Sequence, residues 1–265
     1  MPLAGSPILE VRGISKHFGQ VRALDRVDFE VHPGEVVGFV GDNGAGKSTL
    51  IKIMAGAYQA DEGQYFFDGR EVHVRSPRDA TALGIATVYQ DLALCDNLDV
   101  VANLYLGRED CFGLPGPLGL LDEVDMEKRA SEVLKQLSIN IPSVRTPVAS
   151  LSGGQRQTVA VARTVMWDAR VLIFDEPTAA LGVAQTRQVL DLIKRLRDRG
   201  MGVILVSHNL ANVFAVSDRI IVIRLGRRVA TFDVREASRE EVVGAITGAQ
   251  FGEDDGLPHP AEIGA

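Results

Sequence analysis

The sequence is poor in the features that mark secreted, disulfide-rich or membrane-spanning proteins. It contains two cysteines, Cys95 and Cys111, with no Cys or His partner at metal-binding spacing. No stretch approaches the roughly 18 apolar residues that a membrane-spanning helix needs. The first twenty residues also lack a basic segment followed by an apolar one. We therefore expect reduced cysteines and a chain that neither crosses a membrane nor carries a secretion signal.

Basic residues are also fewer than acidic residues. The 265 residues include 28 Lys and Arg against 35 Asp and Glu, which gives a formal charge of −7 at pH 7. Because phosphate backbones are bound through clustered Lys and Arg, this balance argues against a nucleic-acid partner, although not against docking on a membrane protein. Hydrophobic residues make up 46% of the chain, close to the globular average of about 45–50%, so the composition indicates neither a disordered nor a fibrous protein.

The order of the apolar runs predicts an α/β protein. Short β-type runs alternate with turn residues over 8–31 and again over 64–69, which predicts an antiparallel sheet. Helical spacing, notably at 183–199, separates later apolar runs that are long enough for buried strands. We therefore expect a parallel sheet covered by helices. The predicted strands of that sheet are 35–40, 171–174, 203–206 and 220–223.

The middle of the chain has a different pattern. After Gln90 the β pattern disappears until Val171, and 125–137 and 155–166 show helical spacing behind a Pro- and Gly-rich loop at 113–119. We therefore expect one domain over 1–250 that contains a helical insert, followed by a disordered tail. Its predicted parts are an α/β core with a β subdomain at 8–91 and 166–250, a helical subdomain at 92–165, and a tail at 251–265.

A glycine-rich loop follows the first predicted buried strand. Residues 41–48, Gly-Asp-Asn-Gly-Ala-Gly-Lys-Ser, fit the pattern G-x-x-x-x-G-K-[ST] between a strand and a helix. Such a loop turns backbone N–H groups toward phosphate oxygens, Lys47 neutralises their charge, and Ser48 can ligate Mg²⁺. The strand-loop-helix context favours this phosphate-binding interpretation over an incidental glycine-rich turn.

Two carboxylates end the apolar run that begins at Val171. In a phosphate-loop protein the first, Asp175, normally orients the Mg²⁺ shell. The second, Glu176, is placed to accept a proton from the water that attacks the γ-phosphate. On its own this pair could be an ordinary solvated strand end, and its occurrence after the phosphate loop favours the catalytic interpretation.

A third segment, Leu-Ser-Gly-Gly-Gln at 151–155, precedes a predicted helix. Ser152 is a good helix N-cap, so the segment could be no more than a helix start. Gly153 and Gly154 nevertheless leave N–H groups open to close approach by an anion, so the same segment can bind a phosphate.

Together with Gln90 and His208, these three segments resemble the nucleotide-binding subunits of ABC (ATP-binding cassette) transporters. The resemblance covers about residues 8–248. It implies a P-loop (RecA-like) α/β core, an antiparallel β subdomain and an inserted helical subdomain. The run 176–183 is similar to the branch that imports monosaccharides such as ribose, xylose, fructose and galactose. Most other members carry Asp where this chain has Gly182, in the loop through which the two sites communicate.

The resemblance also implies roles for individual residues. Phe18 would stack on adenine, although it could be a core residue of the small sheet. Gln90 and His208 would sense and hold the γ-phosphate, where the alternatives are a strand-end polar residue and a satisfied histidine. The implied catalytic residues are Lys47, Glu176 and His208, and the implied Mg²⁺ ligands are Ser48, Gln90 and Asp175. The implied ATP-binding residues are Phe18, Gly41, Asn43, Gly44, Gly46, Lys47, Ser48, Thr49, Gln90 and, serving a partner's nucleotide, Ser152, Gly153, Gly154 and Gln155.

The implied function is an ATPase that powers monosaccharide uptake through separate transmembrane permease subunits. A second ATP-binding subunit and, indirectly, a periplasmic sugar-binding protein are the other implied partners, and the cytoplasmic face of the inner membrane is the implied location. An exporter subunit or an importer of another solute remains an alternative. Soluble ABC proteins of translation or DNA repair are disfavoured because the chain has no charged linker or long heptads. A phosphate-loop GTPase is disfavoured because Asn-Lys-x-Asp is missing.

Overall fold

The computed structural model describes residues 5–112 and 120–249. The Pro- and Gly-rich loop at 113–119 and the tail predicted at 251–265 lie outside the described residues. Within the described ranges, none of the helices combines the length and the apolar character needed to cross a membrane.

A six-stranded sheet forms the centre of the molecule. Its strand order is β12-β11-β3-β10-β9-β6, with β12 antiparallel to β11 and the other pairs parallel. Successive residues of β9 enter opposite cores, because Leu172 faces one hydrophobic cluster and Ile173 the other. This burial on both faces explains the continuous apolar runs of the sequence. The strands are β3 (Val36–Val40), β6 (Ile85–Val88), β9 (Val171–Asp175), β10 (Gly202–Val206), β11 (Arg219–Arg224) and β12 (Arg227–Asp233).

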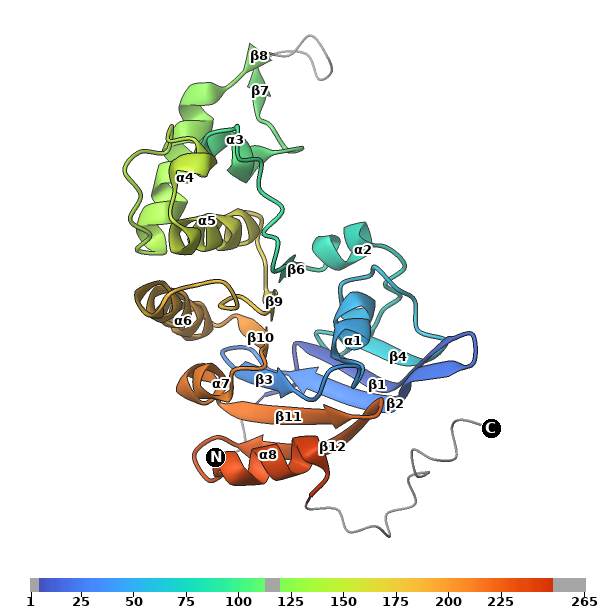
Figure 1. Cartoon of the computed structure of the whole chain (residues 1–265). Helices are drawn as coiled ribbons and strands as arrows, with labels where there is room; N and C mark the ends of the chain where they lie inside the picture. Colours follow the sequence, from blue (N-terminus) through green and yellow to red (C-terminus); the bar gives the residue numbers. More distant parts are fainter. Residues whose placement is uncertain (1–4, 113–119, 250–265) are drawn as a thin grey trace.

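An antiparallel sheet and helix α1 (Lys47–Met54) cover one face of the central sheet (Figure 1). The order of this second sheet is β2-β1-β4-β5. Phe29 of the antiparallel sheet meets Phe39 of β3 edge to face, with ring centroids 5.2 Å apart. Its strands are β1 (Leu9–Phe18), β2 (Val21–Val31), β4 (Glu62–Phe67) and β5 (Arg70–Glu71).

Three helices pack on the opposite face. They are α6 (Val183–Asp198), α7 (Leu210–Val216) and α8 (Arg239–Thr247). Helix α6 buries Val189, Leu192 and Leu196, which recur at helical spacing and form one apolar stripe. Helices α7 and α8 pack against β3 and β11 in a smaller cluster.

The chain between β6 and β9 forms a lobe that projects from the sheets (Figure 1). Leu104, Ala130 and Val159 from its three helices share the core that also contains Leu192 of α6. The lobe contains a hairpin of two-residue strands that the sequence analysis did not predict. Helix α2 (Pro77–Ala82), which lies before β6 and outside the lobe, was not predicted either. The elements of the lobe are α3 (Val100–Tyr105), β7 (Cys111–Phe112), β8 (Leu120–Leu121), α4 (Glu123–Gln136) and α5 (Gly153–Met166).

Candidate functional site

The glycine-rich loop connects β3 to the first turn of α1. Gly46, immediately before Lys47, has φ of 107°, and a Cβ there would lie 2.7 Å from the carbonyl oxygen of Ala23. Both its backbone conformation and the available space therefore require glycine. Helix α1 begins at Lys47, so the positive end of its dipole lies at the loop.

The Lys47 side chain folds back across this loop. Its Nζ donates hydrogen bonds to the carbonyl oxygens of Gly41 and Asp42, at 2.7 and 2.8 Å. Partial burial lowers the pKa of Lys47, and the charges of Glu176, Asp42 and Asp175 act in the opposite direction. The structure thus brings the lysine into the electric field of the two carboxylates at the end of β9, although they are more than 120 residues away in sequence.

Asp175 is the last residue of β9 and is partly buried. Burial and the neighbouring charge of Glu176 raise its pKa, whereas Lys52 and Lys47 lower it. No group of three or more His, Cys, Asp or Glu capable of holding a metal occurs in the part of the chain that the structure describes. One carboxylate with the hydroxyl of Ser48 suits Mg²⁺, which takes most of its ligands from phosphates and water.

We expect Asp175→Asn to raise the melting temperature of the protein measured without nucleotide. The folded pKa of Asp175 lies above the usual value of 3.8, so its contribution favours folding at low pH and is lost as the pH rises through the folded pKa. At neutral pH the ionised carboxylate therefore opposes folding, and the amide removes this penalty. Thermal unfolding without nucleotide measures the rise in melting temperature. Thermal unfolding with Mg-ATP measures the stabilisation by Mg-ATP, which we expect this variant to lose.

Asp168→Asn provides the matched control, because Asp168 is an exposed aspartate in a loop. We expect its melting temperature and its response to Mg-ATP to match those of the unmodified chain. An Asp175→Asn protein that melts lower, or that keeps the full Mg-ATP response, would contradict the role given to this carboxylate.

Glu176 and His208 form a pair beside Asp175. The backbone N–H of His208 donates to Glu176 Oε1 at 2.8 Å, and His208 Nδ1 lies 2.9 Å from Glu176 Oε2. Ser207 Oγ also donates to Oε2, at 3.4 Å. Glu176 has φ of 51°, an uncommon backbone conformation for a residue other than glycine, and such conformations cluster at functional sites. Its side chain is mostly buried, whereas that of His208 is 72% exposed.

Phe18 lies at the end of β1 with its ring half-exposed. It meets Tyr58 edge to face, with ring centroids 5.5 Å apart, and Lys16 Nζ lies 5.6 Å from the Phe18 ring centre. The exposure favours a stacking surface over a core position. The sequence analysis did not predict a role for Tyr58. The only signal for it in the sequence is an aromatic residue shortly after α1.

Gln90 and Glu176 line the same cavity, which has a volume of about 320 Å³. Gly153 of α5 and Leu181, just before α6, complete its wall. The structure therefore brings the end of β6, the end of β9 and the first turn of α5 together. No residue of the loop 41–49 is part of this wall in the residues described.

The segment 151–155 forms the N-terminus of α5. Ser152 Oγ accepts the N–H of Gln155 at 3.3 Å, and Gln155 Oε1 accepts the N–H of Ser152 at 3.0 Å. This is a capping box, and Ser152 is exposed. Ser152 and Gln155 line a different cavity from Gln90, beside Asn140 and α6. The described part of the chain thus does not bring Ser152 to its own glycine-rich loop.

Gly182 is the N-cap of α6. Its φ of −70° is open to any residue, and the nearest atom to a Cβ placed there is Gln185 Oε1 at 4.0 Å. Neither backbone conformation nor space therefore requires glycine at this position.

Comparison with known proteins identifies a family and close relatives. A family model described as ABC transporter matches residues 24–179. The chain is 46% identical over 253 residues to the fructose import ATP-binding protein FrcA of Rhizobium meliloti, covering 94% of this chain and 96% of that protein. It is 43% identical to the xylose/arabinose import ATP-binding protein XylG of Sulfolobus acidocaldarius, covering 93% of this chain and 96% of that one.

The fold also matches solved structures. One is described as the dimeric structure of a post-hydrolysis state of an ATP-binding cassette bound to ADP and Pi. It has a TM-score of 0.70 and 25% sequence identity, and the match covers 86% of this chain and 100% of that one.

Proposed function

The chain belongs to the ABC transporter family, and from this membership we propose that it is the ATP-hydrolysing subunit of an importer for a monosaccharide. Family and fold agree with the expectations drawn from the sequence. The observation that carries the proposal is the similarity to sugar import ATP-binding proteins over more than nine-tenths of the chain. We propose that the molecule consists of an α/β core at 8–91 and 166–250 and a helical subdomain at 92–165.

The phosphate loop supplies the ATP site in this proposal. The N–H groups of the loop and the dipole of α1 attract the phosphates, and the half-exposed ring of Phe18 stacks on the adenine. Lys47 exchanges its two carbonyl contacts for phosphate oxygens, which removes the cost of its partial burial. The loop residues proposed to contact the nucleotide are Gly41, Asn43, Gly44, Gly46, Lys47, Ser48 and Thr49.

Mg²⁺ fits beside the phosphates, where Ser48 and Asp175 would hold it with Gln90 at the edge of the site. Bound there, it would neutralise charge on the β- and γ-phosphates. It would also offset the repulsion between Asp175 and Glu176 that raises the pKa of Asp175.

Hydrolysis depends on the pair of Glu176 and His208. The Glu176 carboxylate accepts a proton from the attacking water, while the N–H of His208 and the hydroxyl of Ser207 fix its orientation. The His208 side chain is exposed, so it can leave its contact with Glu176 Oε2 and turn toward the γ-phosphate.

Two chains are proposed to close over two ATP molecules. The exposed position of Ser152, away from its own glycine-rich loop, supports a role for residues 152–155 at a partner's nucleotide. The match to a dimeric cassette bound to ADP and Pi supports the same arrangement. The N–H group of Gly153, at the positive end of the α5 dipole, would face the partner's γ-phosphate. Gly154 is buried beside Gln185 of α6 in the single chain.

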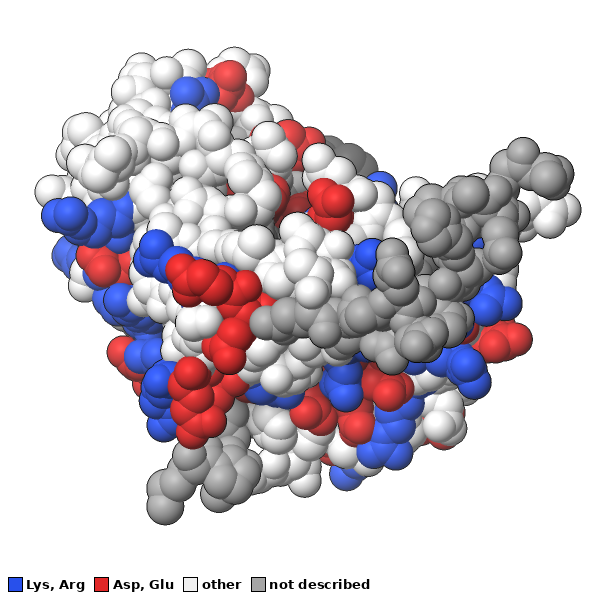
Figure 2. Space-filling model, turned by 60° about the horizontal axis from the view of Figure 1, so that its bottom comes forward, with Lys and Arg blue, Asp and Glu red and all other residues white. Residues whose placement is uncertain are grey.

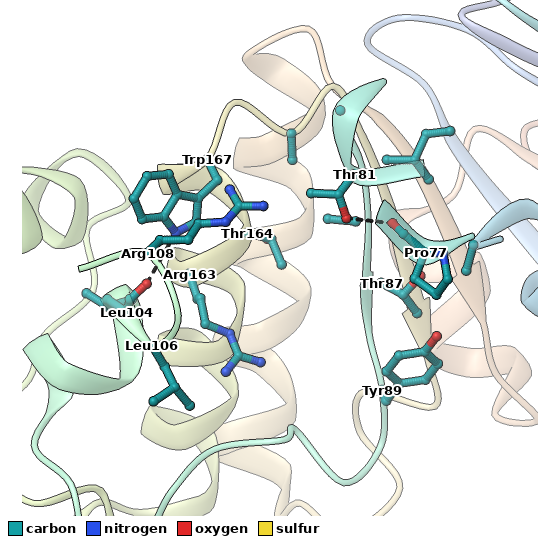
Figure 3. Close-up of a pocket in the computed structure, with 15 residues that line it drawn as sticks. Pro77, Thr81, Thr87, Tyr89, Leu104, Leu106, Arg108, Arg163, Thr164 and Trp167 are labelled. Atoms are coloured by element: carbon teal, nitrogen blue, oxygen red, sulfur yellow. Dashed lines mark hydrogen bonds between the residues drawn. The ribbon is translucent and has the colours of Figure 1, made fainter. Parts of the chain in front are cut away.

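A groove beside the lobe is the proposed docking site for the permease. It has a volume of about 310 Å³ and separates α2 and β6 from α3 and α5. Figure 3 shows Thr87 and Tyr89 on one side and Leu106 and Trp167 on the other. Exposed Tyr89 and Leu106 offer apolar surface to a helix of a membrane subunit.

The proposed location is therefore the cytoplasmic face of the inner membrane, with a periplasmic sugar-binding protein acting on the far side of the permease. A nucleic-acid partner is not proposed. On the face in Figure 2, acidic and basic side chains are interspersed rather than gathered into a basic surface, and the net charge is −7.

Deletion of the gene tests the transport function. We expect the deletion strain to lose high-affinity uptake of one pentose or hexose, while uptake of amino acids, peptides and metals continues. Uptake rates of a panel of radiolabelled sugars measure this loss. The unmodified gene should restore uptake, and the Glu176→Gln gene should not. Wild-type entry of every sugar together with failure of another solute would contradict the monosaccharide assignment while leaving the ATPase assignment intact.

A further inference from the structure

The segment that follows Gln90 has a strained backbone. Leu92 and Ala93 have φ of 58° and 46°, so two successive residues that are not glycine adopt the left-handed conformation. Each carries a steric cost that the surrounding structure must offset. The Leu92 side chain packs against the core of the lobe. The short-range hydrogen bonds from Leu92 N to Tyr89 O and from Ala93 N to Asp91 O, at 3.1 and 2.7 Å, close the turn but do not connect its backbone to another element.

Arg163 of α5 provides that connection. Its Nη1 donates to the carbonyl oxygen of Ala93 at 2.8 Å, and its Nη2 donates to the carbonyl oxygen of Leu92 at 3.3 Å. The two oxygens are those of the two strained residues. The planar guanidinium fork is suited to two adjacent acceptors, whereas an ammonium group is a single point donor.

Among the residues that the structure describes, no carboxylate explains the position of the Arg163 guanidinium. In residues 5–112 and 120–249, no Asp or Glu forms an ion pair with Arg163, and its side chain is partly buried. A partly buried cation is costly unless its donors are satisfied. The carbonyl oxygens of Leu92 and Ala93 accept two of its five N–H donors, and the negative end of the α5 dipole lies nearby because Arg163 is in the last turn.

The position of Arg163 connects three parts of the molecule. Its side chain lines the groove on the side opposite Tyr89 (Figure 3). The segment that it holds includes Leu92, which shares a cavity with Gln90 and Glu176. On the far side of the segment, the amide of Asn103 accepts the N–H of Cys95 and donates to its carbonyl oxygen, at 2.7 and 2.9 Å. Residues 92–95 are therefore anchored at both ends.

We propose that Arg163 is a positioning residue for ATP hydrolysis. Its two hydrogen bonds hold Leu92 and Ala93 in the left-handed turn that directs Gln90 toward the cavity containing Glu176. Because the same guanidinium forms part of the groove, a permease helix bound there acts on Gln90 through it. The inference rests on the proposed function, because it assumes that Gln90 acts at the ATP site.

Arg163→Met removes the donors and keeps much of the apolar stem, and Arg163→Lys keeps the charge as a single donor. In hydrogen exchange of the purified chain without nucleotide, we expect the amides of 92–94 to exchange about tenfold faster in the Met variant. We expect kcat for ATP to fall about tenfold with KM within about twofold, because the phosphate loop is untouched. The Lys variant should fall between the Met variant and the unmodified chain in both measurements.

Arg199→Gln is the matched control, because Arg199 donates to Gln136 Oε1 at 3.2 Å between α6 and α4, outside the site. We expect it to leave the exchange of 92–94 and kcat unchanged. Unchanged exchange in Arg163→Met would overturn the proposal. So would equal impairment of the Met and Lys variants with a raised KM and a lowered melting temperature, because that pattern describes general destabilisation. Hydrogen exchange needs no hydrolysis, so it remains decisive if the ATPase assignment itself fails.

Discussion

Replacing Glu176 with Gln is expected to lower the turnover number for ATP by about 10²–10⁴-fold, the usual contribution of a general base. ATP affinity should change little, because the residue is proposed to act on water rather than on the nucleotide. The variant should therefore accumulate as an ATP-bound dimer. Gel filtration with Mg-ATP and a phosphate-release assay measure the two effects.

The structure explains why glutamine is the informative substitution. Its amide oxygen can still accept the N–H of His208, which Glu176 now accepts at 2.8 Å, so the local conformation should survive. The change removes the proton acceptor and also a negative charge that raises the pKa of Asp175. Binding of Mg²⁺ should therefore be preserved while the chemical step is lost.

Glu236→Gln serves as the control for this experiment, since Glu236 is an exposed glutamate in the loop after β12. Its turnover should equal that of the unmodified chain. A Glu176→Gln protein with full turnover would remove Glu176 from the role of base. If the Glu176→Gln protein loses turnover but forms no ATP-bound dimers, Glu176 is needed for closure of the dimer and not only for the attack of water.

The chemistry of the site could be predicted from the sequence because its parts are local. The loop 41–48 combines a strand end, positive-φ glycine and a helix start within eight residues. The pair Asp175 and Glu176 likewise ends a strand whose apolar residues are continuous. In both places a few consecutive residues determine the backbone and present the reactive groups. The residues that determine the local backbone and the residues that carry the chemistry are therefore recognised in the same short segment of sequence.

Other features depend on contacts between distant segments, which no local pattern encodes. Strand β6 is only four residues long and includes Thr87, so it lacks the apolar run that identified β3, β9, β10 and β11. Strand β12 was not predicted either. The bond from Arg163 to Ala93 spans 70 residues. The predicted roles of Phe18, Gln90 and Ser152 came from family resemblance and not from a local pattern.

Ser152→Arg is expected to abolish ATP hydrolysis although the phosphate loop and Glu176 are intact. Ser152 caps α5 through its hydroxyl, and an arginine there places a positive charge at the positive end of the helix dipole. It would also fill the space that we propose for the partner's phosphate. Loss of the cap alone costs about 1 kcal/mol, so Ser152→Ala measures that part separately. Ser143→Arg, in an exposed loop, controls for the added charge.

Mixing Ser152→Arg with Lys47→Ala tests whether each site is built from two chains. Lys47→Ala alone should bind ATP weakly and hydrolyse none, because the loop loses its only charge complementary to the phosphates. In the mixed dimer, one site combines both lesions and the other carries neither. Recovered hydrolysis, measured as phosphate release against the ratio of the two variants, would show that Ser152 serves the nucleotide held by the partner's Lys47. Normal turnover and ATP-bound dimers of Ser152→Arg alone would instead exclude residues 152–155 from the site.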